Sequence, residues 1–217
     1  MAGSRRIGVV AAAGLMTAVL ATTYLRRVEP WMRHWGATDD ESAGPLAVDE
    51  LVAPGARTTT RAITVRAPIQ EVWPWLVQIG QDRAGFYSYT WLENLVGAGM
   101  HNARSVHPEW QDRFAGDSVW LASQARFHEH GRQVAALVEM PRALVLVSPA
   151  EWERLQRGGR ASGAWAFFLE PHGSTSTRLI IRSSGGAVGT HLFDALHFVM
   201  EQKMMRGLRD RAESRTL

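Results

Sequence analysis

Cysteine is absent from the 217-residue chain, and lysine occurs once, as Lys203. Without cysteine the protein has no disulfide, no thiolate nucleophile and no cysteine-based zinc site, while its redox compartment stays open. A single lysine in a charged C-terminal helical segment leaves little room for Schiff-base chemistry. The sequence also lacks a serine nucleophile elbow, a phosphate-binding glycine loop, a dinucleotide fingerprint and a zinc signature. These absences favour binding over catalysis, and neither a cofactor nor a metal is expected.

The chain has no concentrated basic surface either, although its net charge is +3 and its pI is about 9.9. Residues 1–36 hold five arginines and one glutamate, whereas residues 37–217 hold 19 basic and 20 acidic residues. The larger part is therefore close to neutral and lacks the basic face that a phosphate backbone requires. Nucleic acid is not an expected partner.

One long uncharged run is present, from Ile7 to Leu25, with an arginine pair at each end. As an α-helix it would span roughly 28 Å, close to the thickness of the hydrocarbon core of a membrane. The sequence thus predicts an N-terminal hydrophobic helix, residues 1–27, that anchors the protein in a membrane as a single pass. A cleaved signal peptide and a soluble helix are the alternatives. Similar positive charge on both sides leaves the orientation open.

The next segment, residues 28–57, is rich in alanine, glycine, proline and acidic residues without apolar periodicity, which predicts a linker. A folded domain is expected over residues 58–217. It begins with an alternating strand pattern around Ile63 and Val65. An amphipathic helix then starts at Pro68, and a second, shorter helix covers residues 89–97.

Strand-like segments follow one another closely after these helices, which indicates antiparallel hairpins. A long helical pattern from His191 to Arg211 then carries a wide apolar surface that must be covered. This order predicts an α+β fold, a curved antiparallel sheet wrapped on a long C-terminal helix with a space between them. The expected strands lie at residues 118–122, 133–139, 143–148, 165–170 and 177–182.

Several motifs resemble the SRPBCC superfamily, the helix-grip proteins that include START lipid-transfer domains and polyketide cyclases. They are "APIQEVWPWLVQIG", "GFYSYTWLENL", "HNARSVHPEWQ", "GDSVWL" and "HFVMEQKMM". The resemblance covers roughly residues 38–212 and points to a bacterial group largely without assigned function. It implies a START-like helix-grip fold around a hydrophobic cavity for a lipid, polyketide, sterol or other apolar molecule. It does not fix an activity, because one fold hosts many functions.

The candidate ligand-binding residues are polar or large side chains expected near the cavity: Trp91, His101, Asn102, Trp110, Arg182, His197 and Met200. His101 and Asn102 could face the cavity or form hydrogen bonds within their loop. His197 could accept a proton with help from Glu201 one turn away, or lie in the core with one partner. Arg182 could meet an anionic ligand head or form a surface salt bridge. No residue is assigned a catalytic role.

The "HEH" motif at His128 and His130 would place two imidazoles on one face of a strand, as a metal pair requires. No third ligand is evident in the sequence. No metal site is therefore predicted there.

Three functions remain open. The first is a membrane-tethered domain, expected as a monomer, that binds a hydrophobic small molecule or lipid in its cavity. The second is a cyclase- or dehydratase-like enzyme in which His101, Asn102 and His197 position a substrate and move protons. The third is a protein-interaction module, which a filled cavity would support and an open one of several hundred Å³ would oppose.

Overall fold

The computed structural model describes Met16, Val19 and residues 21–185 and 188–214. Most of the predicted hydrophobic segment, Ile7 to Leu25, therefore lies outside the described residues. Among the helices that are described, none is long and apolar enough to cross a membrane.

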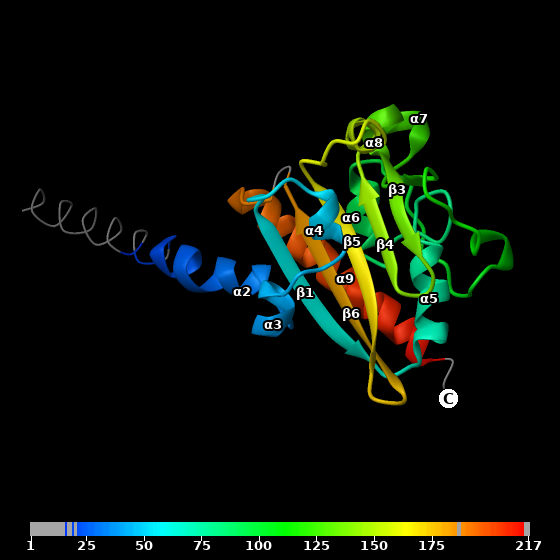
Figure 1. Cartoon of the computed structure of the whole chain (residues 1–217). Helices are drawn as coiled ribbons and strands as arrows, with labels where there is room; N and C mark the ends of the chain where they lie inside the picture. The colour runs from blue at the N-terminus through cyan, green and yellow to red at the C-terminus, as the bar shows by residue number, and fades with distance from the viewer. Residues whose placement is uncertain (1–15, 17–18, 20, 186–187, 215–217) are drawn as a thin grey trace, which may run out of the picture.

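Six antiparallel strands form one sheet in the order β1-β6-β5-β4-β3-β2, as Figure 1 shows. The alternating and β-branched segments of the sequence become these strands, because such side chains pack well on a pleated surface. A register shift between Ala135 and Leu137 interrupts the pairing of β3 with β4, an irregularity of the kind that bends a strand. The strands are β1 (Thr58–Val65), β2 (Ser118–Trp120), β3 (Arg132–Glu139), β4 (Ala143–Val147), β5 (Ala164–His172) and β6 (Ser176–Ser184).

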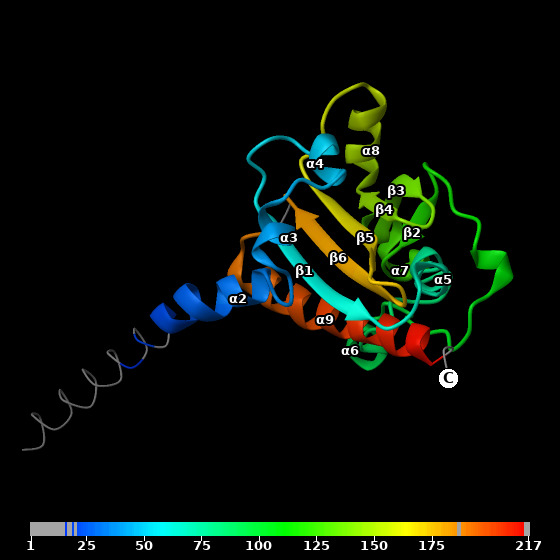
Figure 2. The ribbon, with the colours of Figure 1, turned by 60° about the horizontal axis from the view of Figure 1, so that its bottom comes forward.

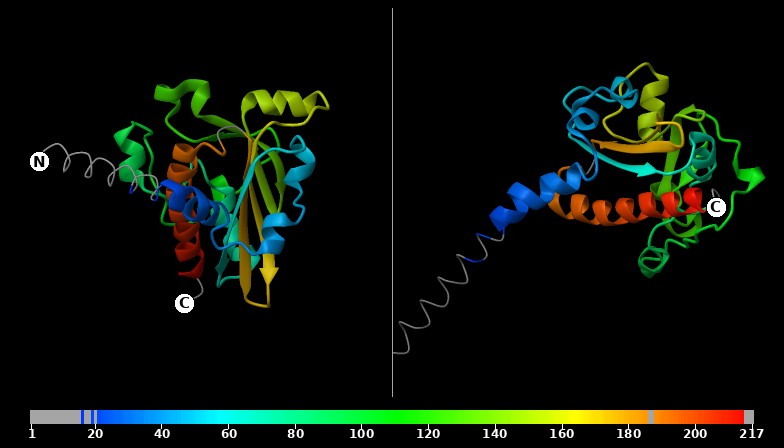
Figure 3. Two further views of the ribbon diagram at one scale, coloured as in Figure 1. Left: turned by 90° about the vertical axis from the view of Figure 1, so that its left-hand side faces the viewer. Right: turned by 90° about the horizontal axis from the view of Figure 1, so that it is seen from below.

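One face of the sheet is covered by two helices, α5 (Ile69–Val77) and the long α9 (His191–Glu213). Figures 2 and 3 show α9 running along this face below β1 and β6. The α+β architecture fits the predicted helix-grip fold. The remaining helices are short: η1 (Tyr24–Val28), α2 (Glu29–Arg33), α3 (Asp39–Ala43), α4 (Val48–Leu51), α6 (Thr90–Leu95), η2 (Pro108–Trp110), α7 (Gln124–Phe127), η3 (His128–Gly131) and α8 (Pro149–Gln156).

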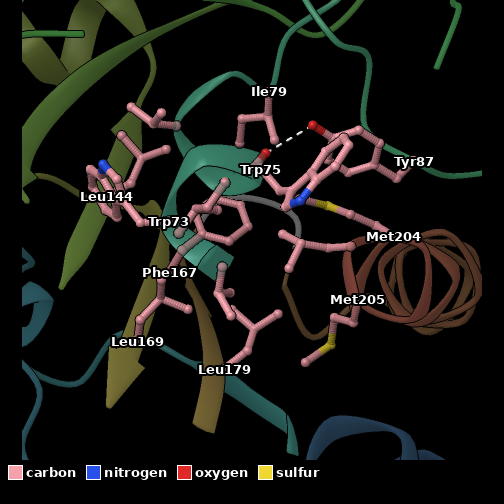
Figure 4. Packing of buried hydrophobic residues seen from close by; sticks show 14 of the residues in the cluster. Trp73, Trp75, Ile79, Tyr87, Leu144, Phe167, Leu169, Leu179, Met204 and Met205 are labelled. Atoms are coloured by element: carbon pink, nitrogen blue, oxygen red, sulfur yellow. Dashed lines mark hydrogen bonds between the residues drawn. The ribbon is translucent and has the colours of Figure 1, made fainter. Parts of the chain in front are cut away.

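The main hydrophobic core lies between the sheet and the C-terminal half of α9 (Figure 4). Tyr87 is buried there, and its hydroxyl group donates a hydrogen bond of 2.9 Å to the carbonyl oxygen of Trp75. Gly207 allows α9 to approach this point, because a Cβ at residue 207 would collide with the backbone of Tyr87. Other members of this core are Trp73, Phe167, Leu169, Leu179, Met204, Met205 and Leu208.

The segment 28–57, which its composition predicts as a linker, carries α2, α3 and α4 and packs against the sheet. Val48 and Val52 are buried in a second hydrophobic cluster with residues of β4, β5 and β6. Arg178 of β6 also forms an ion pair of 2.6 Å with Glu41, which belongs to the capping box at the start of α3. The part of this segment that carries α3 and α4 therefore covers the face of the sheet opposite to α9, whereas α2 lies beside α9.

Candidate functional site

A pocket of about 500 Å³ lies between the N-terminal half of α9 and the end of the sheet where β5 begins and β6 ends. It occupies the space that the sequence predicts between the sheet and the last helix. Its volume and its mixture of apolar walls with a few polar groups are typical of small-molecule sites. The apolar lining residues are Phe86, Leu121, Ala164, Trp165, Val188, Phe193, Met200 and Met204. The polar ones are Ser88, Glu93, Gln133, Ser148, Glu151, Ser162, Ser183, Ser184, His197 and Glu201.

A buried ion pair closes the pocket on the side of α9. Arg61 of β1 is fully buried, and its Nη1 donates to Oε2 of Glu201 at 2.6 Å. The other carboxylate oxygen of Glu201 accepts a hydrogen bond of 2.8 Å from the indole N–H of Trp165. Two charges removed from water are tolerable only when they are paired, as these are, although Nη2 of Arg61 has no hydrogen-bond partner among the described residues. Glu201 therefore fastens α9 to β1 and β5.

His197 lies one turn before Glu201 and contacts the same ion pair. Its Nδ1 lies 3.5 Å from Nη1 of Arg61, and its Nε2 lies 3.5 Å from Oε1 of Glu201. A guanidinium only donates, so Nδ1 is the acceptor and the proton of the neutral ring is on Nε2, facing the carboxylate. Burial lowers the pKa of His197, and Arg61 lowers it further, against the opposing effect of Glu201. The imidazole is therefore neutral near pH 7.

Both nitrogens of His197 are thus directed toward the ion pair rather than toward a ligand. The ring stacks on Phe193 with a centroid distance of 5.1 Å, and it meets Trp165 edge to face at 5.8 Å. These contacts make the imidazole part of an aromatic wall of the pocket. A general base needs a nitrogen free to reach the substrate, and this arrangement does not offer one.

Glu93 of α6 is the polar group of the pocket that sequence reasoning missed. Its Oε2 is buried and has no hydrogen-bond partner among the residues that the structure describes. Burial raises the pKa of Glu93 to about 7. One signal could have found it, since Glu93 follows Tyr89 by four residues and so shares the inward face of the predicted helix.

Two further polar groups of the lining differ in how they are satisfied. Ser183 of β6 is buried, and its Oγ has no hydrogen-bond partner in the described part of the chain. Glu151, by contrast, accepts hydrogen bonds from the hydroxyl group of Ser162 at 2.6 Å and from its backbone N–H at 2.8 Å. Burial raises the pKa of Glu151, but these hydrogen bonds outweigh it and the net shift is downward. Glu151 is thus engaged, whereas Ser183 is not.

The predicted residues of the loop after α6 lie outside this pocket lining. Asn102 ties the loop to the preceding turn, because its Oδ1 accepts from the N–H of Tyr87 at 2.7 Å and its Nδ2 donates to the carbonyl oxygen of Ser88. The side chain of His101 is exposed. Trp110 stacks on His107 with a centroid distance of 4.2 Å. These contacts of the loop are structural.

Of the other predicted residues, His197 and Met200 line the pocket, while Trp91 is 64% exposed on α6. Arg182 is buried on the opposite face of the sheet, where it forms an ion pair of 2.6 Å with Asp49. It also donates to backbone carbonyl oxygens of residues 41–44, so the guanidinium is occupied by the chain itself. The described residues contain no group of three or more histidines and carboxylates that could hold a metal, the "HEH" motif included.

No protein-family model matches the sequence, and no curated protein matches it. Similar solved structures include protein NE0264 from Nitrosomonas europaea, at 14% identity and a TM-score of 0.48 over 73% of this chain and 95% of that one. CalC from Micromonospora echinospora, a self-sacrificing resistance protein, is similar at 12% identity and a TM-score of 0.44 over 73% and 95%. The Polyketide_cyc-like protein Cgl2372 from Corynebacterium glutamicum is similar at 14% identity and a TM-score of 0.34 over 76% and 85%.

These neighbours are 12% to 14% identical to this chain. Matches at such low identity carry no information on a ligand or an activity. The fold assignment rests on the strand order and on the long C-terminal helix, and the site is defined by its own residues.

Proposed function

We propose that this protein binds a hydrophobic small molecule or lipid in the pocket between the sheet and the N-terminal half of α9. The observation that carries the proposal is an open pocket of about 500 Å³ whose walls are largely aromatic and aliphatic. Its best-placed polar groups, Glu201 and His197, are engaged with Arg61 and Trp165, which favours binding over chemistry. An open pocket also weighs against the protein-interaction module.

We further propose that the hydrophobic run from Ile7 to Leu25 tethers this pocket to a membrane. The position of α2 supports the idea, because α2 follows this run in the sequence and lies beside the start of α9, the helix that forms one wall of the pocket (Figure 3). Arg33 forms an ion pair of 2.9 Å with Asp194 there, and Trp31 packs on Phe198. A tether at this point would hold the pocket close to a lipid surface. Release of the full chain from isolated membranes by alkaline carbonate would contradict the tether.

The binding proposal is tested by filling the pocket. Ser183 of β6 is a buried lining residue whose side chain lies on the same face of the sheet as that of its partner Trp165, so Ser183→Phe places an aromatic ring in the space proposed for the ligand. Ala115→Phe adds the same ring at an exposed residue outside the lining and serves as the matched control. The full chain and both variants are purified in dodecyl maltoside, extracted with organic solvent, and analysed for co-purified apolar molecules by mass spectrometry.

We expect one apolar molecule in near-equal amount with the wild-type chain and with Ala115→Phe, and at least about tenfold less with Ser183→Phe, given the bulk of a phenyl ring. Equal recovery from all three proteins would assign the molecule to the detergent or lipid shell and would contradict the proposal. A wild-type chain that is empty and takes up no apolar molecule would contradict it as well.

A cyclase- or dehydratase-like enzyme is the second candidate, and Glu93 is the observation in its favour. A carboxyl group with a pKa of about 7 inside a pocket is suited to donate or accept a proton near neutral pH. If Glu93 does so, the molecule extracted from a Glu93→Gln variant should differ from the wild-type molecule, as a substrate differs from its product. Identical molecules from both proteins would contradict the enzyme.

A further inference from the structure

The charges around the pocket are unevenly distributed. The described lining residues include three carboxyl groups, of Glu93, Glu151 and Glu201, and no arginine or lysine. Arg61 neutralises Glu201 from behind the pocket wall, and Arg154 lies 3.4 Å from Glu151, which also binds Ser162. Glu93 alone is left without a counter-ion among the described residues.

The neighbours of α6 do not supply the missing charge. Lys203 of α9 lies over the ring of Tyr89 at 5.8 Å, and Arg126 of α7 lies over the ring of Phe127 at 5.8 Å. Neither cation forms an ion pair with Glu93 in the part of the chain that the structure describes. Glu93 thus contributes to the pocket lining a carboxyl group whose buried Oε2 has no partner in this part of the chain.

A second group indicates that the pocket is built to receive polar atoms. Ser183 is 4% exposed, it lines the same pocket from β6, and its Oγ has no described hydrogen-bond partner. Buried polar groups are nearly always hydrogen-bonded in native proteins, so two unpartnered atoms in residues that line one cavity call for a partner there. A polar group on a bound ligand is a partner of this kind.

We propose that the ligand is an apolar amine, whose ammonium group binds the carboxylate of Glu93 while its apolar part lies against Trp165, Phe193 and Met200. This inference rests on the proposed function and names the class of molecule that the pocket prefers. An ammonium donates a charge-assisted hydrogen bond to the unpaired carboxylate and neutralises it. An anionic ligand such as a fatty acid would instead meet an unpaired carboxylate, with no cation in the described lining to offset the repulsion.

The test compares three probes of equal chain length, decylamine, decanol and decanoate. Each is equilibrated by dialysis with the full chain in dodecyl maltoside at pH 8, and specific binding is the excess over the Ser183→Phe variant, which subtracts partitioning into detergent. Binding is repeated with Glu93→Gln, which keeps the size of the side chain and removes its charge. Glu153→Gln, at an exposed carboxylate of α8 outside the lining, is the matched control.

We expect decylamine to bind at least about tenfold more tightly than decanol, and decanoate to bind most weakly, as a partly desolvated charge pair requires. Glu93→Gln should remove the preference for the amine over the alcohol and leave decanol binding unchanged, whereas Glu153→Gln should alter neither. Decanol that binds with no preference for the amine, or a preference that survives Glu93→Gln, overturns this inference while the proposed function stands. If none of the probes binds above the Ser183→Phe background, the proposed function fails, and the inference fails with it.

Discussion

The two halves of α9 do different things in the same helix. In its C-terminal half Met205, Leu208 and Ala212 are fully buried against α5 and the sheet (Figure 4). In its N-terminal half Leu192 is 83% exposed and Leu196 is 55% exposed, while the inner side of that half faces a pocket rather than a packed core. The C-terminal half of the helix therefore stabilises the fold, and the N-terminal half forms one wall of the pocket.

Glu201 stands at the junction of these two halves. It lines the pocket, yet its carboxylate is bound by Arg61 and by Trp165, which anchor the helix to the strands. These contacts of Glu201 hold the N-terminal half of α9 in position, although a pocket rather than a packed core lies between that half and the sheet. The comparison thus predicts that the fold depends strongly on Glu201 and on the packed half, and only weakly on the side chains that are exclusive to the pocket.

The largest effect is expected from Glu201→Ala, which leaves the fully buried Arg61 without its counter-ion. Breaking a buried pair in this way costs about 4 kcal/mol of the free energy of unfolding. Denaturant unfolding of the full chain in detergent measures the loss. The double variant Arg61→Met with Glu201→Met should recover much of it, because two apolar side chains leave no uncompensated charge. A loss below about 1 kcal/mol in Glu201→Ala would show that this ion pair does not hold the two halves together.

The fold could largely be predicted from the sequence because its signals are local. Alternation gives the strands, and the apolar stripe from His191 to Arg211 gives the last helix. The stripe cannot show which end is packed, since Leu192 and Leu208 have the same side chain and only the surrounding chain buries one of them. Periodicity reports which face of a helix is apolar and does not report what covers it.

The site was harder to predict because it depends on partners distant in the sequence. Arg182 binds Asp49, 133 residues away, in a segment whose composition predicts a linker. For Asn102 the sequence left two roles open, facing the cavity or hydrogen bonding within the loop, and its side chain accepts a hydrogen bond from the N–H of Tyr87. Glu93 could not be predicted because its distinctive property is a missing partner. That property can be recognised only when the surroundings of the side chain are known. Single residues in a sequence do not carry that information.

A smaller effect is expected from Leu208→Ala in the packed half of α9. Removing a fully buried leucine side chain costs about 3 kcal/mol through lost burial and the cavity left behind. Specific binding of an apolar probe should be unchanged at a temperature where the variant is folded, because Leu208 does not line the pocket. The exposed Leu192→Ala is the matched control and should lower the free energy of unfolding by less than about 0.5 kcal/mol. Similar losses of the free energy of unfolding in both variants would contradict the proposed difference between the two halves of α9.

The smallest effect is expected from Glu93→Gln, a substitution in the pocket that changes how the free energy of unfolding depends on pH. The carboxyl group of Glu93 has a usual pKa of 4.5 in the unfolded chain, and burial raises the pKa to about 7 in the folded protein. Between these values the folded state binds more protons, so the contribution of Glu93 to the free energy of unfolding falls as pH rises and is constant above about pH 7. The side chain of Gln in the Glu93→Gln variant does not titrate, so its contribution to the free energy of unfolding does not fall as pH rises. Relative to the wild type, the variant should gain about 1 kcal/mol between pH 5 and pH 8, an amount that allows for solvent screening of a partly exposed group. Unfolding both proteins at the two pH values measures the gain, and a difference that is independent of pH would mean that the carboxyl group of Glu93 is solvated like one at the surface.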